Sequence, residues 1–302
     1  MFLAKFPKLI NNGKLHKNIT ERVMNGVPTM KPLPYQLLLN IEPHPFVHPN
    51  GRRCGAVIVS PQYALTAYHC VQRYFGGMVP NDIINVYAGA YNLQELHQDK
   101  NVQKRGVQWI HLIDFKNGSS SRDECDCTYK KQRGSYGRYL KGCSWSCTCL
   151  PDLAVLHLDE PLQMNDFVTP ACLPTKEVPM NEECIVSGWG ETYYGSSLPI
   201  TLQAASISIS KVDNCNTRWA GKDKNPGGDY DLCGFHYTKD ACRGDSGGPL
   251  VCKTNGGATL YGIVSRGPAC NPDSPVVGKF GLYGNVYYAK NQIEALIGND
   301  NP

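Results

Sequence analysis

Short apolar segments separated by turn residues run through most of this 302-residue chain. Glycine, proline and asparagine lie between the segments, a pattern that favours an all-β sandwich or barrel. One helix is expected at 288–297, because Ala289, Ile293 and Leu296 would share a face. The expected strands are 35–40, 55–60, 63–67, 83–89, 106–113, 152–158, 184–189, 203–210, 259–265 and 282–288.

Composition narrows the class of protein. Apolar residues make up 41% of the chain and charged residues 19%, which is typical of a globular protein. The net charge of +4 is too small and too evenly spread, outside one segment, for a dedicated nucleic-acid binder. The longest apolar runs fall short of a membrane span, so no membrane partner is expected.

The cysteine content indicates an oxidising compartment. Fourteen cysteines, an even number, suit a framework of disulfides and favour an extracellular protein. Glycosylation sequons at Asn18 and Asn117 agree with secretion. The first ten residues do not form a signal peptide, because Lys5, Pro7 and Lys8 interrupt the apolar stretch. Either the protein begins upstream of this sequence or its export uses another signal. The cysteine content is the stronger indication, so secretion is still expected.

Three separated residues carry the chemistry of a nucleophilic hydrolase. Ser246 lies between glycines in "ACRGDSGGPLVC" (241–252), where a tight loop would expose its hydroxyl group. A serine hydroxyl needs a neighbouring base, and His69 in "LTAYHC" (65–70) is the candidate, because histidine as a residue type titrates in the useful range. Asp152 opens the apolar segment "DLAVLHL" and would need a partner when buried. Orienting the imidazole of His69 would supply that partner.

At these residues the chain resembles the chymotrypsin-like serine endopeptidases, from Arg22 to the final helix but without about 117–150. The order His69, Asp152, Ser246 is that of this family. The resemblance implies two packed six-stranded antiparallel β-barrels and a C-terminal helix. It also implies that Ser246 attacks the scissile carbonyl, that His69 is base and then acid, and that Asp152 orients His69. The backbone N–H groups of Gly244 and Ser246 would form the oxyanion hole.

The resemblance extends to specificity within the trypsin subgroup. Asp240, six residues before the nucleophile, matches the base of the primary pocket, where a carboxylate selects arginine or lysine. The other expected substrate-binding residues are Ser265, Arg266, Gly267 and Gly281. The two glycines keep the pocket open. Arg266 replaces a tryptophan usual in the family and is expected to bring positive charge to the floor of the cleft.

Activation is also implied by the resemblance. "ERVMNG" (21–26) looks like a zymogen cleavage site between Arg22 and Val23. Residues 1–22 would then be a propeptide and 23–302 the peptidase domain, with an insertion at about 117–150. The new Val23 ammonium would pair with Asp245, which would otherwise be a buried uncompensated charge.

By resemblance, eight cysteines form four disulfides, and six cysteines remain. The expected pairs are Cys54–Cys70, Cys184–Cys252, Cys215–Cys233 and Cys242–Cys270. The partners of Cys125, Cys127, Cys143, Cys147, Cys149 and Cys172 stay open. Zinc binding by the closely spaced cysteines is an alternative, although disulfides are the default in an exported chain.

The insertion is a basic segment that contains five of these cysteines. Residues 116–150 hold seven basic and three acidic side chains, so their net charge equals that of the whole chain. Close-set cysteines would staple a segment too small to form a core. A flap of this kind beside the cleft would favour acidic residues upstream of the cleaved bond, or an anionic partner. The alternative is that it points into solvent and only aids solubility.

No cofactor is expected for this chemistry, and the expected partners are protein or peptide substrates. Ala90, His97 and Lys100 replace the carboxylates of calcium-binding relatives, so the loop should not bind calcium. Phe280 leaves a sodium site open, although a packed ring is the simpler interpretation. The alternative function is a protease-like binding or regulatory protein that has lost catalysis.

Overall fold

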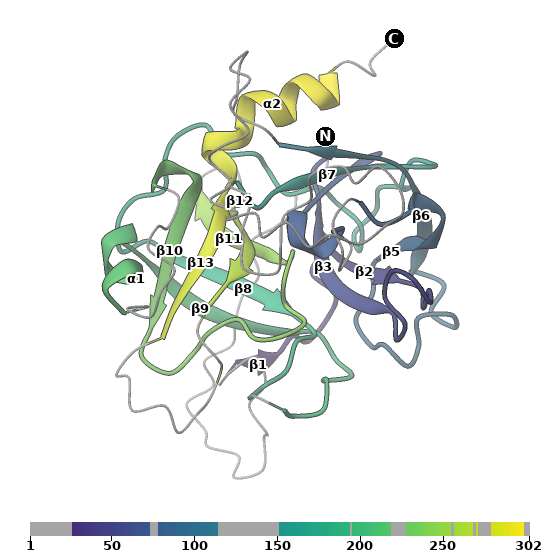
Figure 1. Cartoon of the computed structure of the whole chain (residues 1–302), viewed down its shortest axis with the longest axis horizontal. Coiled ribbons are helices and arrows are strands. Elements are labelled where there is room, and N and C mark those ends of the chain that lie inside the picture. Colours follow the sequence, from purple (N-terminus) through teal and green to yellow (C-terminus); the bar gives the residue numbers. More distant parts are fainter. Residues whose placement is uncertain are drawn as a thin grey trace, which may run out of the picture.

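The computed structural model describes residues 26–72, 78–113, 151–193, 195–218, 228–254, 257–267, 270 and 279–298. These residues form two β-barrels that lie side by side, with helix α2 (Val286–Gly298) across one end of both (Figure 1). The expected architecture of two six-stranded barrels and a C-terminal helix is therefore confirmed. The helix begins two residues before its predicted start.

The first barrel closes in the order β2-β3-β4-β7-β6-β5. All of its neighbouring strands are antiparallel, and β2 pairs with both β3 and β5 to complete the ring. Its core contains fully buried side chains such as Leu37, Leu65 and Leu156. Its strands are β2 (Gln36–Ile41), β3 (Arg52–Ile58), β4 (Tyr63–Thr66), β5 (Ile84–Ala88), β6 (Gln103–Leu112) and β7 (Ala154–Leu158).

The second barrel closes because β8 pairs with both β9 and β11. Strand β1 (Val27–Pro28) is added outside the ring, along β9. In Figure 1 this barrel lies on the left, in green and yellow. Its strands are β8 (Glu183–Gly188), β9 (Gln203–Ser210), β10 (Asp231–His236), β11 (Pro249–Thr254), β12 (Gly257–Arg266) and β13 (Lys279–Asn285).

Each of the ten predicted strands corresponds to an observed strand, but the two-residue strand β1 and three longer elements, β10, β11 and helix α1 (Val212–Arg218), were not predicted. Strand β11 begins in the glycine-rich Ser246 loop, and β10 interrupts its apolar residues with a glycine. Helix α1 is short and polar, and the disulfide from Cys215 to Cys233 ties it to β10. Tertiary contacts rather than local patterning therefore define these three elements.

Direct hydrogen bonds join the two barrels. The Ser187 hydroxyl on β8 donates to Gln36 Oε1 on β2 at 2.8 Å, and both side chains are buried. The backbone N–H of Gly55 on β3 donates to the carbonyl oxygen of Ser246 at 2.7 Å. The loop that carries Ser246 is thus attached to the first barrel.

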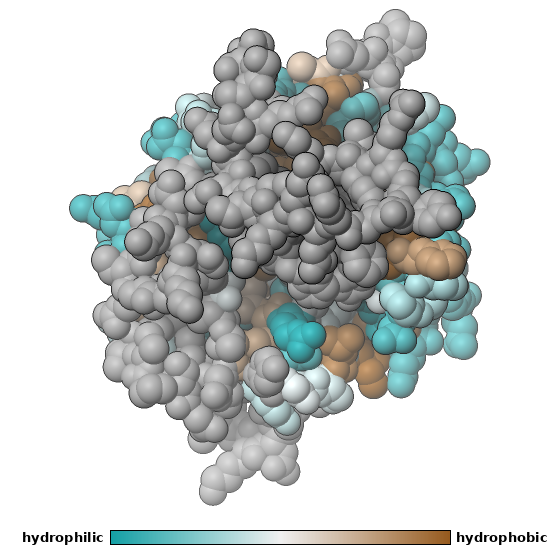
Figure 2. Space-filling view, viewed as in Figure 1, coloured by the Kyte–Doolittle hydropathy of each residue, from teal (hydrophilic) through white to brown (hydrophobic). Residues whose placement is uncertain are grey.

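On the face drawn in Figure 2, described residues at the right-hand edge, over the first barrel, are mainly hydrophilic. Trp109 on β6 is a large apolar side chain that is 58% exposed. Within the described part of the chain, neither helix has the length and apolar character needed to cross a bilayer.

Candidate active site

Pairing of β4 with β7 brings His69 and Asp152 together. These strands are antiparallel, and Thr66 at the end of β4 lies opposite Ala154 at the start of β7. His69 follows β4 in a short 3-10 turn, Tyr68–Cys70, and Asp152 immediately precedes β7. The disulfide between Cys54 and Cys70 anchors the turn to β3. Two residues 83 positions apart therefore meet at one end of the first barrel.

The contact between them is bidentate. The His69 ring Nδ1 lies 2.7 Å from Asp152 Oδ2, and the His69 backbone N–H donates to Oδ1 at 2.9 Å. An ionised carboxylate only accepts hydrogen bonds, so Nδ1 is the protonated ring nitrogen and Nε2 is left as a base. The Asp152 carboxylate thus fixes both the orientation and the tautomer of the imidazole.

Asp152 is 1% exposed, yet it stays ionised. Burial alone would raise the pKa of Asp152, but the charge of His69 and hydrogen bonds from His69 and Ser265 together lower it to about 2. The Ser265 hydroxyl on β12 donates to Asp152 Oδ2 at 2.6 Å. The sequence placed Ser265 among the substrate-binding residues and missed this contact, because no local pattern links residues 113 positions apart.

The Ser246 loop is hydrogen-bonded to Gly55 on β3, and Gly55 is in turn hydrogen-bonded to Thr66 on β4, the strand that precedes His69. The Thr66 hydroxyl donates to the Gly55 carbonyl at 2.8 Å, and the Gly55 N–H donates to the Ser246 carbonyl. Gly247 has a φ of 78°, and a Cβ there would lie 2.3 Å from the Gly55 carbonyl oxygen. Only glycine fits this left-handed conformation and close approach. The half-buried Ser246 is therefore held at the junction of the barrels.

Gly244, two residues before Ser246, has a second left-handed conformation, with φ of 98°. A Cβ at this position would lie 3.0 Å from the Gly190 Cα atom, so the loop packs closely on the segment after β8. A left-handed residue within such a tight turn lets backbone N–H groups point into one space. This conformation is compatible with the oxyanion hole expected from Gly244 and Ser246.

Asp245 is part of this loop, and it is fully buried. It accepts hydrogen bonds from the backbone N–H groups of Gly190 at 2.7 Å and Cys242 at 2.9 Å. Burial raises the pKa of Asp245 to about 6, and the two hydrogen bonds only partly oppose this shift. The expected partner Val23 and the cleavage site at Arg22 lie outside the described residues.

Asp240 is the buried carboxylate of the expected primary pocket, and it is 2% exposed. Its Oδ1 accepts a hydrogen bond from the Ala241 N–H at 2.8 Å. A Cβ on Gly281 would lie 2.8 Å from Oδ1, and one on Gly267 would lie 3.8 Å from Oδ2. The two glycines therefore flank the carboxylate, and their lack of side chains leaves room above it.

Arg266, which was expected to bring positive charge to the floor of the cleft, lies beside a buried carboxylate. Its guanidinium forms an ion pair with Asp231 on β10, whose side chain is fully buried. Arg266 Nη1 also donates to Asp231 Oδ1 at 3.3 Å, so both carboxylate oxygens of Asp231 accept hydrogen bonds from the guanidinium. The negative charge of Asp231 offsets the positive charge of Arg266. The pair therefore has little net charge to attract an acidic substrate.

The structure contains four disulfides among the described residues, and they are the four pairs expected from the resemblance. The five cysteines of the insertion lie outside the described residues, so the pairing of Cys172 stays open. One set of potential metal ligands appears in the described part, Glu191 with Cys242 and Cys270. Both of these sulfurs are already joined in a disulfide and are not available as thiolates.

Phe280 is 9% exposed and packs on Phe235, with 4.6 Å between the ring centres. It thus contributes to a small core with Leu282 and the disulfide of Cys215 and Cys233.

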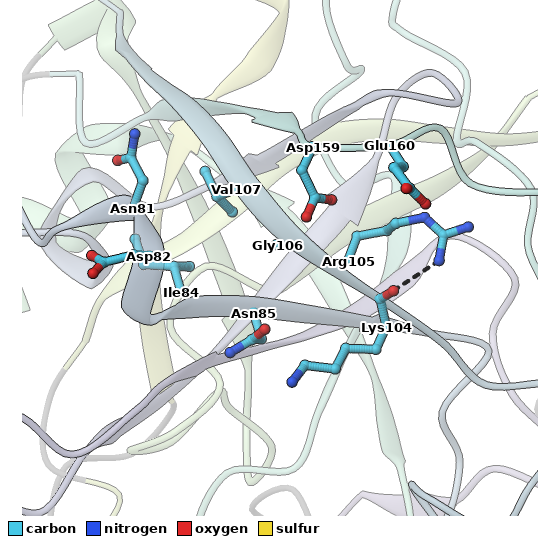
Figure 3. A pocket seen from close by; sticks show the side chains of 10 residues that line it. All are labelled: Asn81, Asp82, Ile84, Asn85, Lys104, Arg105, Gly106, Val107, Asp159 and Glu160. Atoms are coloured by element: carbon cyan, nitrogen blue, oxygen red, sulfur yellow. Dashed lines mark hydrogen bonds between the residues drawn. The ribbon is translucent and has the colours of Figure 1, made fainter.

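A separate hollow lies on the outside of the first barrel and contains none of the expected site residues (Figure 3). Asp82, Asp159 and Glu160 line it together with Lys104 and Arg105. The Arg105 guanidinium donates to the backbone carbonyls of Lys104 and Pro161. Its charges are mixed and its arginine is satisfied by backbone oxygens, so the hollow does not compete with the barrel junction as a reaction site.

Comparison with known proteins agrees with this arrangement. The family model described as trypsin matches residues 26–293. Coagulation factor IX of Oryctolagus cuniculus is 30% identical over 91% of this chain and 87% of the relative. Coagulation factor XI of Bos taurus is 30% identical, and atrial natriuretic peptide-converting enzyme of Mus musculus 29% identical. The chain spans only 36% and 21% of the length of these two proteins. The chain belongs to the trypsin family of chymotrypsin-like serine endopeptidases.

Proposed function

We propose that this serine endopeptidase cleaves peptide bonds after arginine or lysine, with Ser246, His69 and Asp152 as its catalytic triad. The observation that carries the proposal is the bidentate contact of Asp152 with His69, 2.7 Å from Nδ1 and 2.9 Å from the backbone N–H. This contact leaves His69 Nε2 as the basic nitrogen. The hydrogen bond from the Gly55 N–H to the Ser246 carbonyl attaches the Ser246 loop to the first barrel, which supports Ser246 as the partner of His69.

In the proposed reaction, Ser246 Oγ attacks the scissile carbonyl carbon while His69 Nε2 accepts the hydroxyl proton. The N–H groups of Gly244 and Ser246 stabilise the oxyanion of the tetrahedral intermediate. His69 then gives its proton to the leaving amine, and an acyl ester on Ser246 remains. A water molecule, deprotonated by His69, hydrolyses this ester and restores the hydroxyl group. Asp152 stabilises the imidazolium throughout.

Primary specificity is proposed to come from Asp240. A buried carboxylate flanked by Gly267 and Gly281 can form charge-assisted hydrogen bonds with a guanidinium or ammonium group. An uncharged side chain could not form these charge-assisted hydrogen bonds, so it would be bound less tightly.

We further propose that the enzyme is secreted as a zymogen and activated by cleavage between Arg22 and Val23. The raised pKa of Asp245 supports this proposal, because a buried carboxylate of this kind gains most from a new ammonium partner. The net positive charge of residues 116–150 supports an anionic partner or an upstream preference for acidic residues. A peptide library compared between wild type and a form with a shortened insertion tests that preference, and unchanged upstream residues would contradict it.

Hydrolysis of short esters tests the proposed activity. Protein cleaved after Arg22 should hydrolyse arginyl and lysyl esters, and matched leucyl esters should react at least about 100-fold more slowly in kcat/KM. The Ser246→Ala variant is the matched control and should be inactive. A cleaved, folded protein that hydrolyses none of these esters would instead favour the binding or regulatory protein.

A further inference from the structure

Arg266 connects a buried carboxylate of the second barrel to the catalytic aspartate. Its side chain is 20% exposed and that of Asp231 is 0% exposed, so the ion pair is largely shielded from water. The Arg266 Nη1 group of the same guanidinium donates to Ser265 Oγ at 3.2 Å. Ser265 Oγ in turn donates to Asp152 Oδ2 at 2.6 Å. A continuous row of polar contacts therefore runs from Asp231 to His69.

The chemistry of each group sets the direction of these hydrogen bonds. A guanidinium can only donate, so Ser265 Oγ must accept from Arg266. A hydroxyl group has one proton, and Asp152 is an acceptor when ionised. With one of its lone pairs occupied by Arg266, Ser265 keeps its single proton directed at Asp152 Oδ2.

Packing alone does not account for this ion pair. Two apolar side chains of similar volume would be as stable in a buried position, or more stable, because they avoid the desolvation of two charges. A compact lysine ammonium could balance Asp231 but would lack the planar fork that reaches two acceptors at once. The pair is therefore suited to holding a third group, and the group that it holds is Ser265.

Resting on the proposed function, we propose that Arg266, held by Asp231, is a positioning residue that fixes the Ser265 hydroxyl as a donor to Asp152. Arg266 would act on the reaction through Ser265, Asp152 and His69, without touching the reacting atoms. Its effect should thus appear in kcat with substrates too short to reach beyond the primary pocket. A role in binding upstream substrate residues would instead appear in KM and only with longer peptides.

A mutant cycle tests this coupling. One arm replaces the ion pair in the double variant Arg266→Met/Asp231→Leu, which leaves no unpaired buried charge. The second arm is Ser265→Ala, and the third combines all three substitutions. With a short arginyl ester, the double variant should lose about tenfold in kcat at unchanged KM, the magnitude of one hydrogen bond to a charged group. In the Ser265→Ala background the same replacement should change kcat less than about twofold.

An equal loss of kcat in both backgrounds, or no loss in either, would overturn the proposal. The Arg266→Lys variant keeps the charge beside Asp231 and covers the case in which the double variant does not fold. Its kcat should also fall at unchanged KM. Full kcat in a folded Arg266→Lys protein would contradict the need for the guanidinium fork.

NMR titration of the His69 ring separates this proposal from the proposed function, because it needs no turnover. Losing the fixed hydroxyl donor makes Asp152 more basic, so Asp152 holds the imidazolium more tightly. The titration midpoint of His69 should move to higher pH in the double variant but should not move further when Ser265→Ala is already present. If replacing Arg266 and Asp231 leaves the titration midpoint of His69 unchanged in both backgrounds, the inference is overturned. A wild-type protein that hydrolyses no ester overturns only the proposed activity.

Discussion

At the scale of single residues, Asp245 and Asp152 show how the same kind of burial can have opposite outcomes. Both carboxylates are at most 1% exposed. Asp152 has the imidazole of His69 beside it, and its pKa falls to about 2. Asp245 accepts two backbone hydrogen bonds, from Gly190 and Cys242, and its pKa rises to about 6 because burial dominates. The charge of His69 and the hydrogen bonds from His69 and Ser265 thus outweigh burial at Asp152, whereas two backbone hydrogen bonds do not outweigh it at Asp245.

The raised pKa of Asp245 predicts how activation changes stability with pH. A carboxyl group whose folded pKa exceeds its unfolded value binds its proton more tightly when folded. The uncleaved form should therefore lose stability as the pH rises from about 4 to about 6. A Val23 ammonium beside Asp245 would remove this loss. The cleaved form should exceed the uncleavable Arg22→Gln form in unfolding temperature by more at pH 7 than at pH 4.

Thermal unfolding of both forms at the two pH values measures this difference. Asp245→Asn is the control, because an amide does not titrate and the gap should then be independent of pH. A gap of equal size at pH 4 and pH 7 in the native sequence would argue against pairing of Val23 with Asp245.

At the scale of elements, the ends of β12 and β13 shape the pocket over Asp240. Gly281→Ala would place a methyl group 2.8 Å from Asp240 Oδ1, whereas Gly267→Ala would place one at an ordinary contact distance of 3.8 Å from Oδ2. Gly281→Ala should therefore raise KM for an arginyl ester about tenfold or more, and Gly267→Ala, whose methyl group would lie farther from the Asp240 carboxylate, should raise it less. Steady-state kinetics of the two variants checks the difference, and equal effects would contradict this geometry.

Sequence reasoning located most strands, because apolar segments between turn residues are a local signal that marked strands such as β2 and β7. The proposed triad was also predicted from local signals, such as the glycines around Ser246. Contacts between distant residues carry no such signal. Asp231 and Arg266 are 35 positions apart, and only the pairing of β10, β13 and β12 brings them into contact. The ion pair of Arg266 with Asp231 therefore could not be predicted from the sequence.

At the scale of the whole molecule, the site depends on how the two barrels are joined. His69 and Asp152 belong to the first barrel, whereas Ser246, Asp240 and Ser265 belong to the second. The hydrogen bond from Ser187 to Gln36 Oε1 crosses the junction in a buried position. Any change that loosens this junction should therefore alter the placement of His69 relative to Ser246.

Ser187→Ala should lower the free energy of unfolding by about 1–3 kcal/mol, because it leaves the buried Gln36 Oε1 without its donor. It should also reduce kcat more than it changes KM. Urea denaturation and ester kinetics measure the two effects. Ser208→Ala, at a half-buried serine on β9, is the control and should change both by little. If the free energy of unfolding falls by the predicted amount while kcat does not change, the junction does not position the site.

The most direct measurement for the central claim is covalent labelling by an organophosphonate that carries an arginine-like side chain, followed by mass mapping of the modified residue. With protein cleaved after Arg22, we expect one label per chain, located on Ser246. Ser246→Ala should not react, and Asp240→Asn should react at least about 100-fold more slowly because the guanidinium loses its charged partner. Folded, cleaved wild-type protein that remains unlabelled, or that is labelled at another residue, would contradict the assignment of Ser246 as the nucleophile of an arginine-directed endopeptidase.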